Sequence, residues 1–454
     1  MIVQNLTNIF LNDCDYKKIN KMTNIKLRHN LNGIQLTDVI YYKFMYSKIG
    51  TTKESVVSII NNRNQTMFSR QAFEYKEDNI PYEFYLNIFN RIKNYYNSIK
   101  NESITTPHII AIDGTYSNNI NMDEILNMGL YDVTNGIPID LISYGKENKN
   151  KEIYATTDYI KRNINLFKNN IVVCDRAYYS YDFLDFLNKN KIKFIVRAKG
   201  SADLLNQTTE LKQYNPKYNA ILNIKKYVRV IKYENVITKT IYASNNKKNI
   251  KRNILKIKND CVIITNLLDE TKYNKDTILN MYRSRWDIEV FFKYIKSNFK
   301  FQHIYEKSKS KQSKMYICEL ILTYLVKILI KYYTDKYPLK KNDTYTYKIN
   351  EKNLVNGIFD SLLYDILSGK LTSSKLDYLC NAYIKIVQNK KNRSYPRVSK
   401  RPFSKWYIKA YSNLTKYMKI INAIFDDNIN TLNKNLKTLA TKILSINGHE
   451  YNNG

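Results

Sequence analysis

An α/β fold is predicted for residues 105–310, with helical regions on either side at 1–104 and 311–454. Short apolar runs typical of buried strands alternate there with short helical patterns, whereas the flanking regions carry mainly helical periodicity. The chain has 454 residues, too many for one ordinary domain, and 44% of them are hydrophobic. We therefore expect more than one domain, each with a core of its own.

The order of elements in the α/β region is read from local patterns. The segment TPHIIAIDGTY indicates a buried strand followed by a turn at its Asp-Gly pair, and Thr134-Asn135-Gly136 indicates the turn of a hairpin. In chain order we expect a strand (106–113), a hairpin (130–145), a helix (about 155–168), a strand (170–175), a helix (182–190) and a strand (193–200). A ribonuclease-H-like sheet has this order, as do many other α/β domains.

A basic, β-rich insertion interrupts this pattern at about 200–258. It holds thirteen Lys or Arg against three acids, together with runs such as KKYVRVIKY that favour strands. After it, CVIITNLL (261–268) resumes as a strand, and one long helix is expected from about Asp276 to Phe299. The α/β region is therefore predicted to be a catalytic core with an inserted β segment.

The charge of the chain favours a polyanionic partner. Lys and Arg total 73 against 40 acids, a net charge of 73 − 40 = +33. Such an excess repels itself in the folded state and is compensated by binding a polyanion. Double-stranded DNA fits better than a membrane, because no amphipathic basic helix stands out. An A+T-rich genome also produces part of this Lys and Asn bias, so charge alone does not decide the function.

The cysteines and the N-terminal segment indicate a location inside the cell. Five scattered Cys without a CxxC pair, and only four His, argue against a zinc site or a disulfide framework. The segment MIVQNLTNIFLND lacks the basic and apolar parts of a signal peptide. The most apolar run, Cys318 to Ile330, is too short to span a bilayer and predicts a buried helix. We expect an intracellular protein that is not secreted and lies with DNA: in a prokaryotic cytoplasm, a nucleus or a viral factory.

The N-terminal region carries a possible DNA-reading element. Residues 55–81 predict two short helices, with Ser69 capping the second and with Arg70, Gln71 and Lys76 exposed. A helix-turn-helix that reads DNA is one interpretation, and a plain helical bundle is the other. We assign 1–104 as a helical DNA-binding region.

The long helix places four polar residues on one stripe. At about 100° per residue, Tyr282, Arg285, Glu289 and Lys296 fall within roughly 60° of one another. An apolar stripe lies beside them and can anchor the helix on the sheet; its members are Met281, Ile288, Phe292, Ile295 and Phe299. Trp286 is expected to pack in the core. An exposed face with ordinary ion pairs is the alternative for the polar stripe.

These four residues reproduce the spacing Y-x(2)-R-x(3)-E-x(6)-K, which resembles the signature of the insertion-sequence-four transposase family. The family's two strand-end aspartates are matched by Asp113 in IAIDGT and Asp175 in VVCDRAYY. An isolated Asp after a strand is more often a cap or part of a turn, but here both agree with the helix signature. The resemblance covers about residues 108–300, including the position of the β insertion.

The resemblance implies a DDE-type transposase with Asp113, Asp175 and Glu289 as catalytic and metal-binding residues. Three carboxylates brought together repel each other unless cations neutralise them, and hard oxygen ligands suit two Mg²⁺ or Mn²⁺ ions. The family implies that Asp113 bridges both ions. It also implies that water would first nick the DNA at an element end, and that the freed 3′-hydroxyl would then attack the other strand or a target phosphate. Four residues are expected to bind DNA: Tyr282, Arg285, Lys296 and Arg176.

The C-terminal region adds a basic segment. Residues 378–425 contain eleven Lys or Arg and no acid. Their centre, NKKNRSYPRVSKRPFSKW, predicts a contact with the DNA backbone through Arg393, Arg397, Lys400 and Arg401. A solvated loop or a nuclear-import signal is the alternative. By family resemblance we expect a homodimer in the complex with element ends and target DNA.

Two other functions remain open from the sequence. The chain could be a domesticated or inactive transposase-derived protein that still binds DNA. It could also be a metal-dependent endonuclease that cleaves DNA without strand transfer. Both readings share the acidic site with the transposase and differ from it in the reaction that follows.

Overall fold

The computed structural model describes residues 2–12, 18–19, 36–49, 53–65, 67–100, 107–119, 124–145, 151–198, 227–243, 251–299, 301, 303–304, 308–337 and 345–388. The chain divides into two compact units. The first comprises residues 1–235 and 259–392, and the second comprises 236–258 and 393–454. The site discussed below and the first five strands of the sheet lie in the first unit, which is a mixed α/β structure.

A mixed sheet forms the centre of this unit. In the described residues its strands run in the order β3-β2-β1-β4-β5-β7-β6, with β8 beside the end of β1. β1, β4 and β5 are parallel to one another, whereas β2, β3 and β7 run antiparallel to their neighbours. The strands are β1 (Ile109–Asn119), β2 (Glu124–Asp132), β3 (Ile137–Gly145), β4 (Ile171–Cys174), β5 (Lys193–Arg197), β6 (Arg229–Ala243), β7 (Lys251–Thr265) and β8 (His303–Ile304).

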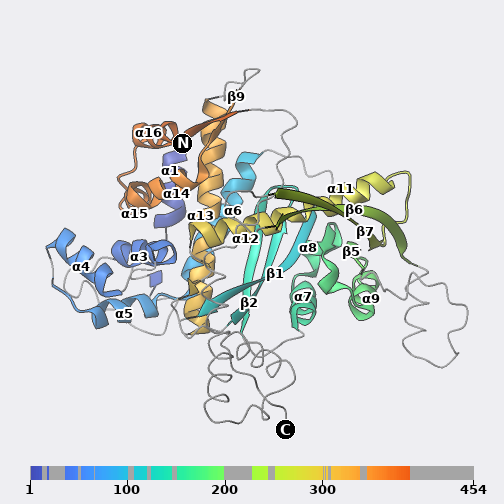
Figure 1. Ribbon diagram of the computed structural model, residues 1–454. Helices are drawn as coiled ribbons and strands as arrows, with labels where there is room; N and C mark the ends of the chain where they lie inside the picture. The colour runs from blue at the N-terminus through green and yellow to red at the C-terminus, as the bar shows by residue number, and fades with distance from the viewer. Residues whose placement is uncertain are drawn as a thin grey trace, which may run out of the picture. The chain divides into compact units, whose positions relative to one another are not determined.

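Helices cover both faces of this sheet (Figure 1). Side chains alternate between the faces along a strand, so Ile110 and Ile112 of β1 point one way and Ala111 the other. Ile110 and Ile112 pack in an apolar cluster with α7 (Lys151–Arg162), α8 (Ile164–Lys168) and α9 (Tyr181–Lys189). Ala111 packs in a different cluster, which includes the buried side chains of α12 (Trp286–Asn298). Even-numbered residues of β1 therefore face α7, α8 and α9, whereas odd-numbered residues face α12.

Most of the expected elements in the α/β region are confirmed, with one instructive exception at Gly114. The hairpin is present, and Gly136 in its turn has a φ of +66°, which favours glycine. The expected turn after Asp113 was wrong, because β1 continues to Asn119 and Gly114 pairs with Met128. Glycine within a strand often marks the close approach of another group.

The long helix expected from about 276 to 299 is interrupted. It forms α11 (Lys275–Ser284) and α12, with Arg285 between them. The amide of Arg285 bonds the carbonyl of Tyr282, three residues back, and Ile288 bonds Arg285 in the same way. This tighter winding is that of a 3₁₀ turn, so the two helices meet at the residue whose side chain enters the site.

α12 lies directly on the sheet because Gly129 of β2 leaves room for it. A Cβ at position 129 would come within 2.6 Å of the Phe292 ring. Beside it, the Phe291 and Tyr131 rings stack with centroids 5.4 Å apart. The predicted apolar stripe of the helix is confirmed: Ile288, Phe292, Ile295 and Phe299 are buried, and Met281 of α11 is partly buried.

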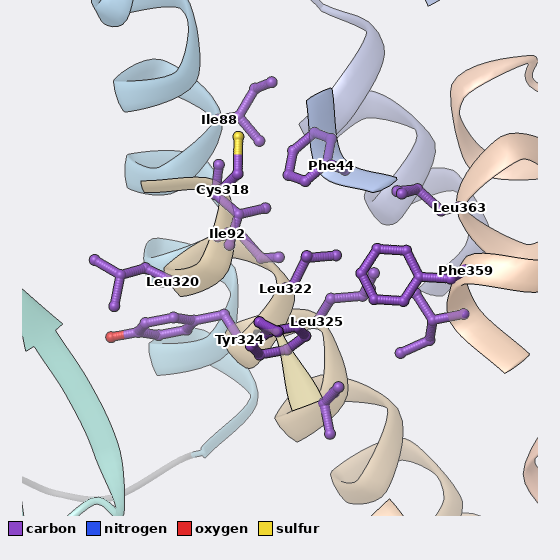
Figure 2. Close-up of a cluster of buried hydrophobic side chains, with 14 of the residues drawn as sticks. Phe44, Ile88, Ile92, Cys318, Leu320, Leu322, Tyr324, Leu325, Phe359 and Leu363 are labelled. Carbon is purple, nitrogen blue, oxygen red and sulfur yellow. The ribbon is translucent and has the colours of Figure 1, made fainter. Parts of the chain in front are cut away.

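A helical core adjoins the sheet (Figure 1). Its longest helix, α13 (Lys309–Lys336), packs against β3 and lies in one apolar cluster with the other helices. Figure 2 shows the cluster, in which Cys318, Leu322 and Leu325 of α13 meet Ile88 and Phe359. The predicted buried helix is confirmed. The cluster also contains buried residues of α1 (Ile2–Leu11), α3 (Leu36–Ile49), α6 (Tyr82–Lys100), α14 (Glu351–Gly357), η3 (Ile358–Leu362), α15 (Leu363–Leu367) and α16 (Ser373–Ala382).

The two short helices predicted over 55–81 are present as α4 (Lys53–Asn64) and α5 (Arg70–Asn79). The Ser69 hydroxyl caps α5 by accepting the amide of Ala72 at 3.2 Å, as expected. The expectation that Lys76 is exposed was wrong, because it is 4% exposed. Lys76 lies three residues after buried Phe73 on the same helix face, and its aliphatic stem can cover apolar surface.

We expected the region after residue 311 to be helical throughout. This was wrong, because two strands lie within its described residues. β9 (Tyr345–Ile349) and β10 (Ile384–Gln388) form an antiparallel pair in which Tyr347 lies opposite Ile386. Both segments are rich in aromatic and β-branched residues, which favour strands. Within the described ranges, no helix combines the length and the apolar character needed to cross a bilayer.

Candidate active site

Asp113 lies in the middle of β1, on the sheet face covered by α12. It has the parity of Ala111 and stands opposite Gly129, over which Phe292 packs. Burial raises the pKa of Asp113 to about 7; the guanidinium of Arg285 opposes this rise, and the carboxylates of Asp175 and Glu152 add to it. A buried carboxylate among other carboxylates holds its proton unless a cation compensates the charge.

Asp175 directly follows β4 and lies beside Asp113. The two strands are parallel with Ile112 paired to Cys174, so the next residues of both strands are neighbours. Asp175 also has the capping role of an isolated aspartate, because its Oδ1 accepts the amide of Ala177 at 2.7 Å. That bond fixes the side chain at the end of the strand.

Arg285 joins two of the predicted site residues. Its Nη1 lies 3.0 Å from Oδ2 of Asp113, and its Nη2 lies 2.7 Å from Oε1 of Glu289. The three side chains are 12%, 16% and 28% exposed, so the ion pairs are only partly screened by water. Glu289 on α12 is thereby brought to the face of β1 that carries Asp113. The predicted triad therefore gathers at one place in the sheet.

The other predicted DNA-binding residues are distributed around this point. Tyr282 is buried below the Arg285 guanidinium, which lies 6.0 Å from the ring centroid. Arg176 is exposed just after Asp175. Burial lowers the pKa of Lys296, and among the described residues Glu289 is paired with Arg285 rather than with Lys296. The signature therefore forms a contact chain from Tyr282 through Arg285 to Glu289, with Lys296 further along the helix.

Two other expectations have different outcomes. Trp286 does not pack in the core: it is 38% exposed, and the Lys293 ammonium lies 4.5 Å from its ring centroid. It follows the 3₁₀ turn, which directs it away from the buried stripe. Four predicted DNA contacts lie outside the described residues: Arg393, Arg397, Lys400 and Arg401.

Sequence reasoning missed a fourth carboxylate, that of Glu152 in the first turn of α7. Its Oε1 accepts the Tyr178 hydroxyl at 2.9 Å, and the carboxylate lies against Gly114, whose amide bonds Oδ1 of Asp113 at 2.9 Å. Burial raises the pKa of Glu152, and the charge of Asp175 adds to the rise. We expected the helix to start near 155, which left this residue in a loop. No local pattern marked it, because Gly114, against which Glu152 lies, is typical of a turn in the sequence.

The donor chemistry of the site suits a hard divalent cation, and the arrangement of its side chains sets a condition on binding one. Carboxylate oxygens are the ligands preferred by Mg²⁺ and Mn²⁺, and burial of Asp113 creates the demand for positive charge. Among the described His, Cys, Asp and Glu side chains, no three are arranged to hold one ion. Arg285 contacts both Asp113 and Glu289, so coordination by both requires that Arg285 turns away.

Comparison with known protein families matches residues 128–325 to the transposase DDE domain. The matched segment includes Glu152, Asp175 and Glu289, and it begins after Asp113. Among solved structures, the chain is distantly similar to a piggyBac transposase synaptic complex with hairpin DNA, determined by cryo-EM. The identity is 11%, 88% of each chain is covered, and the TM-score is 0.44.

A comparison with curated proteins finds no match. Residues 128–325 are thus similar to a transposase DDE domain, and this match supports a DDE transposase.

Proposed function

We propose that this protein is a DNA transposase that cleaves the ends of a mobile element and joins them to target DNA. The observation that carries the proposal is the Arg285 bridge between Asp113 and Glu289, next to Asp175. It lies largely in a segment similar to a transposase DDE domain. The finer assignments, a ribonuclease-H-like core and the insertion-sequence-four family, rest on the element order and the Tyr-Arg-Glu-Lys spacing.

The acidic residues would hold the metal ions of this reaction. Asp113, Asp175 and Glu289 offer oxygen ligands for two Mg²⁺ or Mn²⁺ ions, which stabilise the entering and leaving oxygens of an in-line phosphoryl displacement. Arg285 is the internal counter-ion of two of these carboxylates. If these carboxylates held a metal ion, the Arg285 guanidinium would be free to turn away and bind a DNA phosphate in bidentate fashion.

The basic residues of the chain orient the DNA. The net charge of +33 attracts the duplex, and exposed Arg176 next to Asp175 can contact a phosphate near the cleaved bond. We propose double-stranded element ends and target DNA as the partners, with two copies of the chain in the complex. The protein is then expected wherever the element's DNA resides.

The test is cleavage and joining of a duplex that carries the inverted repeat found beside the gene. Purified wild type is compared in Mg²⁺ with D175N and E289Q. Asn at 175 can still accept the Ala177 amide, and Gln at 289 can still accept from Arg285, so each removes charge while keeping shape. We expect both to lose cleavage by on the order of 10³-fold, as when one of several cooperating catalytic groups is removed.

D287N is the matched control, because Asp287 is an exposed carboxylate on the same helix, two residues from Glu289. It is expected to cleave like wild type. Equal cleavage by all four proteins would exclude the proposed site. Cleavage without joining would favour an endonuclease, and salt-sensitive binding without cleavage would favour a domesticated DNA-binding protein.

A further inference from the structure

Glu152 reaches the site from the opposite side of the sheet to Glu289. Gly114 has the parity of Ile110 and Ile112, so it faces α7, whereas Asp113 faces α12. A Cβ at position 114 would lie 2.1 Å from Oε1 of Glu152 and 2.7 Å from its Cδ. The carboxyl group therefore occupies the space that any other residue at 114 would fill. Glycine within β1 is what lets it lie against the backbone of Asp113.

The surroundings of Glu152 in the described residues are a neutral donor and other acids. The Tyr178 hydroxyl donates to Oε1 of Glu152, while Asp175 and Asp113 are close enough to interact with its charge. A carboxylate with a purely structural role would be stabilised by a cationic partner and destabilised by neighbouring carboxylates. Here the negative charge is instead concentrated beside Asp113 and Asp175. Such a concentration is stable when a cation is bound.

We propose that Glu152 is a fourth acidic residue of the cation site, acting together with Asp113 and Asp175 from the α7 side of the sheet. This inference rests on the proposed function, because it assigns a ligand for the metal that the transposase reaction needs. The Tyr178 hydroxyl holds the carboxylate in place, as hydrogen bonds from neighbouring residues do for metal ligands. Glu152 and Glu289 then approach Asp113 from opposite faces of one sheet.

The test measures Mn²⁺ binding to the full chain by electron paramagnetic resonance, which does not depend on cleavage. E152Q keeps the size of the side chain and an acceptor for Tyr178 but removes the charge. We expect its Mn²⁺ dissociation constant to rise by more than the roughly tenfold or greater loss that follows when only a hydrogen bond to a metal ligand is removed. E152D keeps the charge and is expected to recover part of the affinity. It also keeps the proposal testable if E152Q fails to fold.

Two controls separate ligation from a structural role. D158N removes an exposed carboxylate of the same helix, one that pairs with Arg162, and is expected to bind Mn²⁺ like wild type. Y178F removes only the hydrogen bond to Glu152 and is expected to weaken binding much less than E152Q. Equal weakening by Y178F and E152Q would overturn the ligand role and make Glu152 a positioning residue.

The failure of this inference is distinguishable from the failure of the proposed function. If D113N loses Mn²⁺ affinity while E152Q binds like wild type, Glu152 is not a ligand and the transposase site stands. If D113N and E152Q both bind Mn²⁺ like wild type, the cation site itself is excluded. Loss of affinity in both, with D158N unchanged, supports the four-carboxylate site.

Discussion

Buried charge is treated differently in the helical core and at the sheet position of Asp113. In the helical core, the Lys43 ammonium lies 2.7 Å from Glu77, and Lys53 lies 3.4 Å from the other oxygen of Glu77. Glu319 of α13 is fully buried, and burial raises its pKa far above the usual value, so it is neutral. In these two cases the buried charge is either paired or neutralised by a proton.

Around Asp113 in the sheet, by contrast, acidic side chains outnumber the basic ones that contact them within the described part of the chain. Asp113 interacts with Asp175 and Glu152, and Arg285 is the cation that contacts both Asp113 and Glu289. Folding alone gives no reason to bring these carboxylates together, because each added acid raises the cost of ionising its neighbours. The difference between the two regions indicates that the acidic group is there for a ligand. Three substitutions test this comparison.

The largest expected effect is in the helical core, from E77Q. It removes the carboxylate that Lys43 and Lys53 share, so that Lys53 retains only Glu74 at 3.7 Å among the described residues, and this costs about 3–5 kcal/mol of the free energy of unfolding. Although burial would raise it, the pKa of Glu77 is lowered from 4.5 to about 2 by Lys43 and Lys53. A lowered acid pKa adds stability that is full above pH 4.5 and is lost as the pH falls toward 2.

Urea unfolding of wild type and E77Q at pH 7 and pH 3 measures this difference. The difference in the free energy of unfolding between wild type and E77Q should be smaller at pH 3 than at pH 7. An equal difference in the free energy of unfolding at both pH values would show that the charge of Glu77 does not contribute to the stability of this region.

The next effect has the opposite sign and comes from E319M. Both carboxylate oxygens of Glu319 are without a hydrogen-bond partner among the described residues, so an apolar side chain of similar size should raise stability by about 1–3 kcal/mol. A raised acid pKa costs stability as the pH rises above the unfolded value, so the gain should be larger at pH 8 than at pH 5.

Thermal unfolding at the two pH values checks this expectation. D335N is the control, because Asp335 lies on the same helix but is 56% exposed and paired with Lys331. It should change the melting temperature little. Destabilisation by E319M would mean that the buried carboxyl group of Glu319 makes a stabilising polar contact.

The smallest effect tests the sheet side of the comparison through R285Q. Removing the guanidinium frees Asp113 and Glu289 from the cation that they share, so Mn²⁺ should bind about tenfold more tightly, a gain of about 1.4 kcal/mol. DNA cleavage should nevertheless fall, because the proposed phosphate contact is lost. Calorimetric titration with Mn²⁺ measures the affinity, and R283Q, at an exposed arginine nearby, is the control. Weaker binding in R285Q would contradict the role of Arg285 as a counter-ion.

The sequence predicted the elements whose patterns are local. The apolar runs before Asp113 and Asp175, the turn at Gly136 and the cap at Ser69 each depend on neighbouring residues, and all are present. The spacing of Arg285 and Glu289 predicted their shared helix side because helical periodicity is regular.

The features that the sequence did not reveal depend on contacts between distant segments. Gly114 is typical of a turn until the carboxylate of Glu152 is known to lie against it. Lys76 is typical of a surface until the surrounding helices cover it. The break at Arg285 lies in a segment without glycine or proline, so no local breaker marks it. Tertiary packing decided each of these positions.

The glycines at 114 and 129 also offer a way to recognise copies of this gene that have lost activity. Every amino acid that can replace a glycine adds at least one carbon atom, and at these two positions that atom would meet Glu152 or Phe292 within 2.6 Å. Damage at either codon would separate the acids while leaving all four acidic codons intact. In a genome with many copies of the gene, a copy in which Gly114 or Gly129 is replaced would therefore be expected to be inactive even though its four acidic residues are unchanged.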